Sequence, residues 1–142
     1  MSTALVQPYL NFEGRCEEAL RFYERAVGAK TESLYRFKDA PPVPGGGRPP
    51  GPPDKVMHAS FRVGDAVLMA SDCECGGRPA FAGISLAYTV KDDAAAERAF
   101  QALAEQGEVR QPLAATFFAS RFGVVVDRFG VCWMILASPR SP

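Results

Sequence analysis

The chain repeats one order of elements twice, and this repeat constrains its fold more than any other feature. In the first half, residues 6–12 alternate apolar and polar side chains, as a strand does. Apolar residues then recur at helical spacing between Cys16 and Val27, and Gly28 follows where a helix end favours a left-handed residue. Three more strands are predicted, at residues 31–37, 56–63 and 66–71.

The second half follows the same plan. Residues 84–90 are predicted to form a strand, and Asp92 or Asp93 precedes a helical pattern as its N-cap. Gly107 is expected to terminate this helix, as Gly28 terminates the first. An irregular extended region at 109–118 and strands at 122–127 and 131–137 complete the repeat. Each half is therefore predicted to be a βαβββ module.

Two such modules predict an α+β fold in which a cupped mixed sheet carries one helix on each module. We expect a single domain over residues 1–142, with module one at about 4–72 and module two at about 82–138. A chain of 142 residues can bury a core of sufficient size for this. The Pro- and Gly-rich stretch 40–54 is an insertion in module one, and it is either a plain loop or a lid over a site.

Charge and hydropathy exclude several classes of partner. Lys and Arg together number 16, as do Asp and Glu, so there is no electrostatic case for nucleic acid or an anionic membrane. The chain lacks an 18-residue apolar run and a signal-peptide pattern, which predicts a soluble cytoplasmic protein with reduced thiols. Cys73-Glu74-Cys75 is a weak zinc pattern, and we expect ordinary loop thiols there.

Polar residues on the predicted strands are the main candidates for ligand contacts. They either bind a small neutral or zwitterionic molecule or satisfy one another and water in a vestigial cavity. His58, the single histidine, is either a general base or lone metal ligand, or a hydrogen-bonded strand residue; the local sequence supplies no acid partner, which favours the second interpretation. The other polar candidates are Gln7, Tyr9, Asn11, Ser60, Ser71, Ser85 and Thr89.

Aromatic and basic residues in the second half form another group of candidates. Phe117 and Phe118 can cover a ligand, and Arg121 can hold a carboxylate or phosphonate; core packing and a surface Arg are the alternatives. Near the C-terminus, Trp133 and Ile135 alternate with Cys132 and Met134. One pair should pack beneath a helix while the other faces the cup. Cys132 is expected to be a small apolar filler.

Several motifs together resemble those of a known superfamily. They are the strand Gln7–Phe12, the helical Arg21-Phe22-Tyr23-Glu24, Met57-His58-Ala59, Leu68–Asp72 and the hairpin from Asp127 to Met134. In this combination the chain, from about Ala4 to Ala137, resembles the vicinal oxygen chelate superfamily, within it the PhnB-like branch of the glyoxalase/bleomycin-resistance group. The resemblance implies two βαβββ modules and a homodimer whose chains shape the pockets together.

The resemblance also implies four metal ligands, usually His, Glu, His and Glu, on the first and last strands of each module. In this chain those positions fall at Gln7, Met69, Ser85 and Met134. Hard and borderline divalent ions favour carboxylate oxygen and neutral imidazole, so this set is a poor metal site. We therefore expect no metal and no other cofactor, and we include Met69 and Met134 among the ligand-binding candidates.

Three functions remain open. The first is a protein that binds an unknown small molecule for sequestration or resistance. The second is a lyase, isomerase or dioxygenase that acts through His58, Tyr9 or an unusual metal set with Cys73 or Cys75. The third is a structural or regulatory homodimer without a ligand. No Ser-His-Asp order is credible around the single histidine, and no glycine fingerprint for a dinucleotide or methyl donor supports the methyltransferase label sometimes given to this branch.

Overall fold

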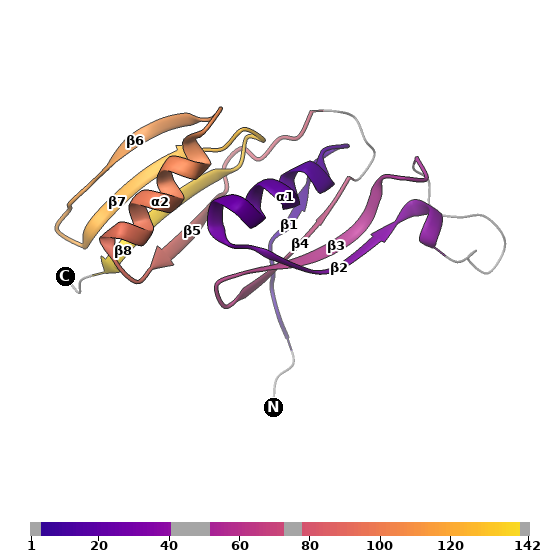
Figure 1. Cartoon of the computed structure of the whole chain (residues 1–142), viewed down its shortest axis with the longest axis horizontal. Helices are drawn as coiled ribbons and strands as arrows, with labels where there is room; N and C mark the ends of the chain where they lie inside the picture. Colours follow the sequence, from indigo (N-terminus) through magenta and orange to yellow (C-terminus); the bar gives the residue numbers. More distant parts are fainter. Residues whose placement is uncertain (1–3, 41–51, 73–77, 140–142) are drawn as a thin grey trace. The chain divides into compact units, whose positions relative to one another are not determined.

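The chain forms two compact units, residues 1–79 and 80–142. The computed structural model describes residues 4–40, 52–72 and 78–139. Each unit contains a four-stranded mixed sheet and an α-helix in the order βαβββ (Figure 1). The predicted α+β class and the internal repeat are confirmed. Residues 41–51 of the predicted insertion at 40–54 lie outside the described residues, as does Cys73-Glu74-Cys75.

The first unit has the strand order β1-β4-β3-β2. β1 runs parallel to β4, and the other neighbours are antiparallel. β3 and β4 have the predicted bounds, and Gly64, with φ 58°, forms the turn between them. The elements are β1 (Tyr9–Asn11), α1 (Cys16–Val27), β2 (Lys30–Arg36), the 3-10 helix η1 (Phe37–Asp39), β3 (Val56–Val63) and β4 (Ala66–Ser71).

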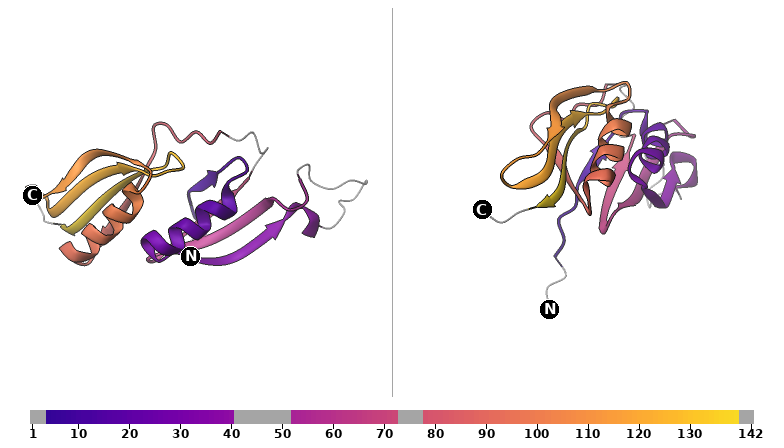
Figure 2. Two further views of the ribbon diagram at one scale, coloured as in Figure 1. Left: turned by 45° about the horizontal axis from the view of Figure 1, so that its top comes forward. Right: turned by 60° about the vertical axis from the view of Figure 1, so that its left-hand side comes forward.

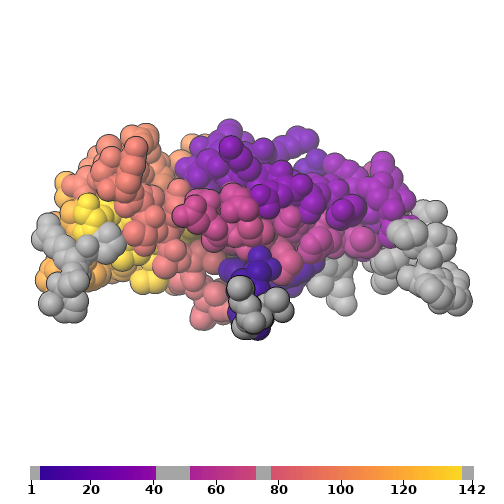
Figure 3. Space-filling view, turned by 90° about the horizontal axis from the view of Figure 1, so that it is seen from below, coloured from indigo at the N-terminus to yellow at the C-terminus, as the bar shows by residue number. Residues whose placement is uncertain are grey.

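The core of the first unit lies between α1 and one face of its sheet (Figure 2). Tyr23 of α1 stacks on Phe61 of β3 with ring centroids 6.1 Å apart. Leu10 and Phe12 are buried as predicted, but Val6 is 97% exposed. The strand begins only at Tyr9, so the prediction that Val6 belongs to its apolar face was wrong. Gln7 and Pro8 still hydrogen-bond to β4, and the chain before them extends beyond the sheet (Figures 1 and 3).

Both ends of α1 have a clear physical cause. Gly28 takes the predicted left-handed conformation at φ 69°, and its amide bonds the Tyr23 carbonyl. At the other end, the buried Asp72 replaces a local cap, because its carboxylate accepts the backbone N–H groups of Gly14 and Cys16 at 2.9 and 2.7 Å. Its second oxygen accepts the N–H of Val56 at 2.7 Å. Asp72 thus joins α1 to β3.

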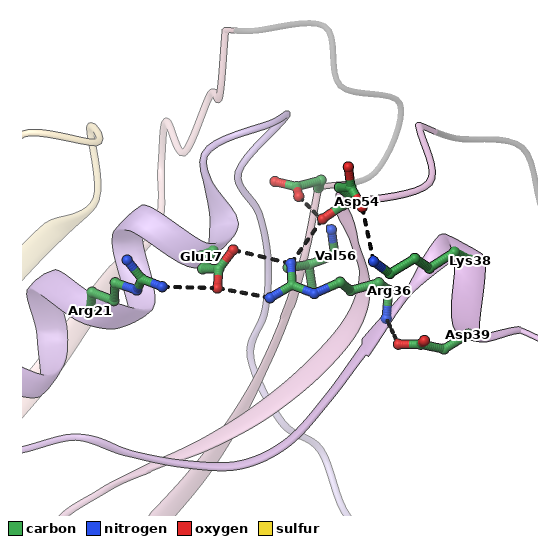
Figure 4. Close-up of polar contacts among 8 residues, drawn as sticks. Glu17, Arg21, Arg36, Lys38, Asp39, Asp54 and Val56 are labelled. Carbon is green, nitrogen blue, oxygen red and sulfur yellow. Dashed lines mark hydrogen bonds and ion pairs between the residues drawn. The ribbon is translucent and has the colours of Figure 1, made fainter.

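A group of charged residues fixes α1 to the end of β2 (Figure 4). Both Glu17 carboxylate oxygens accept hydrogen bonds from the Arg36 guanidinium, at 2.8 and 3.1 Å. The hydrogen bond from Arg36, with further help from Arg21, holds the pKa of Glu17 below its usual range. Lys38 pairs with Asp54 at 3.0 Å beside this contact.

The second unit has the strand order β5-β8-β7-β6, with β5 parallel to β8. Asp92, one of the two predicted N-cap residues, caps α2, because its side chain accepts the Ala95 N–H at 2.8 Å. In the part of the chain that the structure describes, no helix is long and apolar enough to cross a membrane. The elements are β5 (Ser85–Val90), α2 (Asp93–Ala104), β6 (Glu108–Ala114), β7 (Ala119–Val126) and β8 (Cys132–Pro139).

Two local predictions for this unit were wrong. Gln106, not Gly107, takes the left-handed conformation after α2, at φ 60°. Position 107 requires glycine for another reason: the Val126 carbonyl oxygen lies so close that a Cβ would collide with it. The irregular region is a continuous strand, β6, in which Pro112 is tolerated because β6 is an edge strand with two register shifts.

Candidate functional site

Each sheet has one face against its helix and an opposite face, which we call the open face. In the first unit, Ala59 and Phe61 of β3 are buried beneath α1, whereas His58 and Ser60, which alternate with them, are half-buried on the open face. The register places six of the seven predicted binding residues of the first unit on this one face. They are Tyr9 and Asn11 of β1, His58 and Ser60 of β3, and Met69 and Ser71 of β4.

The open face of the first unit supplies His58 with a partner. The Tyr9 hydroxyl lies 3.1 Å from His58 Nδ1, and the two rings are 5.6 Å apart. Tyr35 of β2 is directly opposite His58 in the β2–β3 pairing and is 53% exposed. Two phenol rings and an imidazole therefore gather on this face. The local sequence could not identify the partner, because Tyr9 and His58 are 49 positions apart.

Most other polar residues of this face hydrogen-bond to the protein. Ser60 and Ser33 share a hydrogen bond of 2.7 Å between their hydroxyls. Ser71 donates to the Asn11 side-chain oxygen at 3.0 Å. Gln7, just before β1, donates its amide to the Val67 carbonyl at 2.9 Å. These contacts fit the interpretation that the polar groups satisfy one another, while Tyr9, Tyr35 and His58 keep exposed surface.

In the second unit, the open face carries Ser85 and Thr89 of β5 and Met134 of β8. Ser85 is opposite Cys132 across the parallel β5–β8 pairing, and Thr89 is opposite Leu136. Trp133 and Ile135 are buried on the α2 side, with 2% and 0% of their surface exposed. The predicted alternation along β8 is thereby confirmed.

A pocket of about 480 Å³ opens at one end of this face, and we call it the unit 2 pocket. Ser85, Cys132 and Val126 form a row across three paired strands on one of its walls. Arg110 of β6 contributes the charged group, and Phe81 and Ile84, just before β5, contribute apolar surface. Its size is within the usual range of small-molecule sites.

The structure does not bring Arg121 to the open face. The predicted strand at 122–127 begins earlier, at Ala119, so Arg121 is inside β7 and opposite Ala137, on the α2 side. There it pairs with Asp93 at 3.4 Å and Glu97 at 3.8 Å. Of the two aromatics, Phe118 packs against Phe122 with centroids 5.1 Å apart, while Phe117 is 83% exposed.

The four positions at which the resemblance implies metal ligands can be compared between the units. Met69 is opposite Tyr9 in the β1–β4 pairing, and Met134 is opposite Ala87 in the β5–β8 pairing. Gln7 and Ser85 each lie two residues before the partner of the methionine, so the two pairs of positions have the same offset along the chain.

The residues at these positions do not fit a divalent metal. Two thioethers, an amide and a hydroxyl offer neither carboxylate nor imidazole, which hard and borderline divalent ions favour. Within residues 4–40, 52–72 and 78–139, no three His, Cys, Asp or Glu side chains come together as a metal site.

Sequence reasoning missed three residues that the structure places at these faces. Tyr35 and Ser33 lie on β2 and reach His58 and Ser60 through the β2–β3 register, which periodicity alone does not determine. Arg110 lies in the region predicted as irregular, so no strand face could be assigned to it. An isolated Arg in an edge strand carries no local signal of function.

Comparisons with known proteins agree with this architecture. The family model described as 3-demethylubiquinone-9 3-methyltransferase matches residues 4–136. Protein YjdN from Escherichia coli is 31% identical over 96% of this chain and 97% of its own. The crystal structure of PA1353 from Pseudomonas aeruginosa shares 40% identity, covers 96% of this chain and 98% of its own, and superposes with a TM-score of 0.82.

A second similar solved structure is described by both the methyltransferase name and the PhnB name. It is a protein from Bacillus cereus described as a putative 3-demethylubiquinone-9 3-methyltransferase and PhnB protein. It is 26% identical, covers 95% of this chain and 100% of its own, and has a TM-score of 0.77. The chain shares its fold with a glyoxylase/bleomycin resistance protein/dioxygenase domain from Frankia sp., and it belongs to the PhnB-like 3-demethylubiquinone-9 3-methyltransferase family.

Proposed function

We propose that this protein binds a small organic molecule on the open faces of its sheets without a conventional divalent metal, as a sequestering or resistance-type protein. The main support for the proposal is the chemistry of the side chains at the four positions where the resemblance implies metal ligands. A pocket that holds a dication needs negative charge to offset it, and Gln7, Met69, Ser85 and Met134 supply none. The unit 2 pocket supports ligand binding, since it offers apolar walls and a few polar groups.

A thermal-shift screen of metabolites in a chelator-containing buffer tests this function. A ligand that binds only the folded state must raise the melting temperature in a saturable way. We expect saturable hits whose binding is unaffected by the chelator. Failure of every compound to stabilise the chain in the chelated buffer, with stabilisation only after a divalent metal is added, would contradict the proposal.

The contact between Tyr9 and His58 favours one alternative, an enzyme that uses acid–base chemistry. A phenol within hydrogen-bond distance of an imidazole can fix the ring and exchange a proton with it. In this case His58→Ala and Tyr9→Phe should abolish turnover of any identified substrate while ligand binding persists. Cys75→Ala tests the unusual metal set, because metal lost from that variant would favour a metalloenzyme.

We also propose that the protein is a homodimer. Each four-stranded sheet ends in two edge strands, and edge strands tend to be covered or paired. Light scattering coupled to size-exclusion chromatography checks this directly. A measured molar mass equal to that of a single chain at every concentration tested would rule out the homodimer.

A further inference from the structure

We propose that the unit 2 pocket selects small organic acids, with Arg110 holding the acid group and the apolar wall holding the hydrocarbon part. This inference rests on the proposed function and narrows it to a class of ligand. It depends on three features of the pocket: the sign of its charge, the chemistry of its wall, and two polar groups beside Arg110.

The charge of the pocket favours an anion. Arg110 is the charged residue of the lining, and no acidic side chain lines the pocket among the described residues. Glu108 is nearby, but its Oε2 lies 3.9 Å from Arg110 Nε, and both side chains are more than half exposed. Arg110 has no hydrogen bond within the described part of the chain, so its planar fork of donors is available to a carboxylate.

The wall of the pocket favours a hydrocarbon group on the same ligand. Phe81, Ile84 and Val126 contribute apolar surface. Ile84 is 68% exposed, which leaves a large aliphatic side chain in contact with water. An aromatic or branched aliphatic group in the pocket would remove that surface from water and add a favourable hydrophobic term. An inorganic anion would leave it exposed.

Two neutral polar groups stand beside this wall. The Ser85 hydroxyl and the Cys132 thiol belong to residues directly opposite each other in the β5–β8 pairing. Within the described residues, neither side chain has a hydrogen bond. The hydroxyl can donate to the second oxygen of a carboxylate or to a polar substituent. Cys132 also provides a chemical probe, because a bound ligand would shield its thiol.

Matched pairs of probes test the ligand class. 3-Phenylpropanoate and 4-methylpentanoate each have a primary amide of nearly the same shape but without charge. We measure dissociation constants by titration calorimetry or NMR. Each acid should bind at least about tenfold more tightly than its amide, in line with one charge-assisted bidentate contact.

Variants assign that difference to Arg110. Arg110→Met should remove the preference for acids, and Arg110→Lys should retain only part of it because lysine cannot form the bidentate contact. Arg98→Met is the matched control, because Arg98 is an exposed residue of α2 that does not line the pocket. It should keep the full preference. Circular dichroism confirms that each variant is folded.

Thiol labelling locates the bound acid. Trypsin cuts after Arg128 and Arg140, so the peptide that contains Cys132 contains no other cysteine. Iodoacetamide labelling of this peptide should slow when either acid is present, and the Arg110→Met variant should lose the protection. Cys16 serves as an inert reference, because burial raises the pKa of its thiol.

The outcomes separate this inference from the proposed function. If the amides bind as tightly as the acids, or Arg110→Met keeps the acid preference, selection of acids by Arg110 is wrong while small-molecule binding stands. If acids bind without protecting Cys132, the site is elsewhere. If neither pair binds and the metabolite screen gives no saturable hit, the inference and the proposed function both fail.

Discussion

Asp127 accepts the indole N–H of Trp133 at 3.0 Å, and both side chains are buried. The other Asp127 oxygen accepts the backbone N–H groups of Phe129 and Val131 at 2.8 and 3.1 Å. This carboxylate therefore closes the hairpin between β7 and β8 and anchors the largest side chain of the core in the second unit. The acid of the Asp-Arg-Phe-Gly motif has a structural role, with its oxygens engaged by three N–H donors.

Replacement of Asp127 by Asn should destabilise the fold. An amide offers one acceptor oxygen where the carboxylate offers two, so at least one buried donor loses its partner. We expect a loss of about 1.5–3 kcal/mol in the free energy of unfolding, measured by urea denaturation. Asp65→Asn, at the exposed turn between β3 and β4, is the matched control. Equal stability of the two variants would show that the Asp127 contacts contribute little.

Substitution of Gly123 by Ala should also destabilise the second unit. A Cβ at Gly123 would lie 2.7 Å from Cε2 of Phe100 and 3.0 Å from the Leu113 Cα. Overpacking of this kind typically costs about 1–3 kcal/mol. Phe100→Leu in the same chain should recover part of this loss, since it removes the closest atom. A double-mutant cycle checks this, and strictly additive effects would contradict the proposed collision.

The contact between Glu17 and Arg36 should make stability depend on acidic pH. Hydrogen bonding by Arg36 lowers the folded-state pKa of Glu17, so the ionised form favours the folded chain. This contribution is complete above the usual Glu value of 4.5 and is lost as the pH falls through the lower folded-state pKa.

Glu17→Gln isolates this effect. The stability difference between wild type and this variant should be present at neutral pH and should shrink on acidification below 4.5. Denaturant titrations across this range provide the measurement. Glu24→Gln, at an exposed position on the same helix, is the control. A difference that does not change with pH would mean that the Glu17 carboxylate contributes nothing through its charge.

Carboxylate and imidazole donors at the four equivalent positions should give the chain affinity for a divalent metal. The variant that carries Gln7→His, Met69→Glu, Ser85→His and Met134→Glu restores imidazole and carboxylate donors. We expect it to bind a divalent ion such as Zn²⁺ or Mn²⁺ more tightly than wild type by calorimetry. The matched variant with Gln in place of both Glu residues should bind weakly. Equal metal binding by wild type and the restored variant would contradict the role given to these residues.

Periodicity and turn residues were sufficient to predict most of the fold. β3 and β4 match their predicted bounds, and the residues that end α1 and begin α2 were identified from Gly28 and Asp92. The predicted boundaries of helices and strands were wrong where the local sequence signals were weak. The expected cap at Gly107 was wrong because the constraint on that residue is contact with a distant strand, which local sequence does not reveal.

The candidate site was less predictable than the fold. Alternation indicated which side chains of one strand share a face, but the gathering of Tyr9, His58 and Met69 on one face of the sheet depends on strand register. Arg121 ended on the opposite face because β7 begins three residues earlier than expected. Asp72 was noted only as the end of the motif Leu68–Asp72, and its role as the cap of α1, across 56 positions of sequence, was not predicted.

The metal content of the native protein tests the central claim most directly. Protein purified without chelator, then dialysed against metal-free buffer, is analysed by inductively coupled plasma mass spectrometry for Mg, Mn, Fe, Ni and Zn. The absence of carboxylate and imidazole at Gln7, Met69, Ser85 and Met134 predicts substoichiometric amounts of every ion. One tightly held ion per chain, lost when these positions are changed to alanine, would contradict the account.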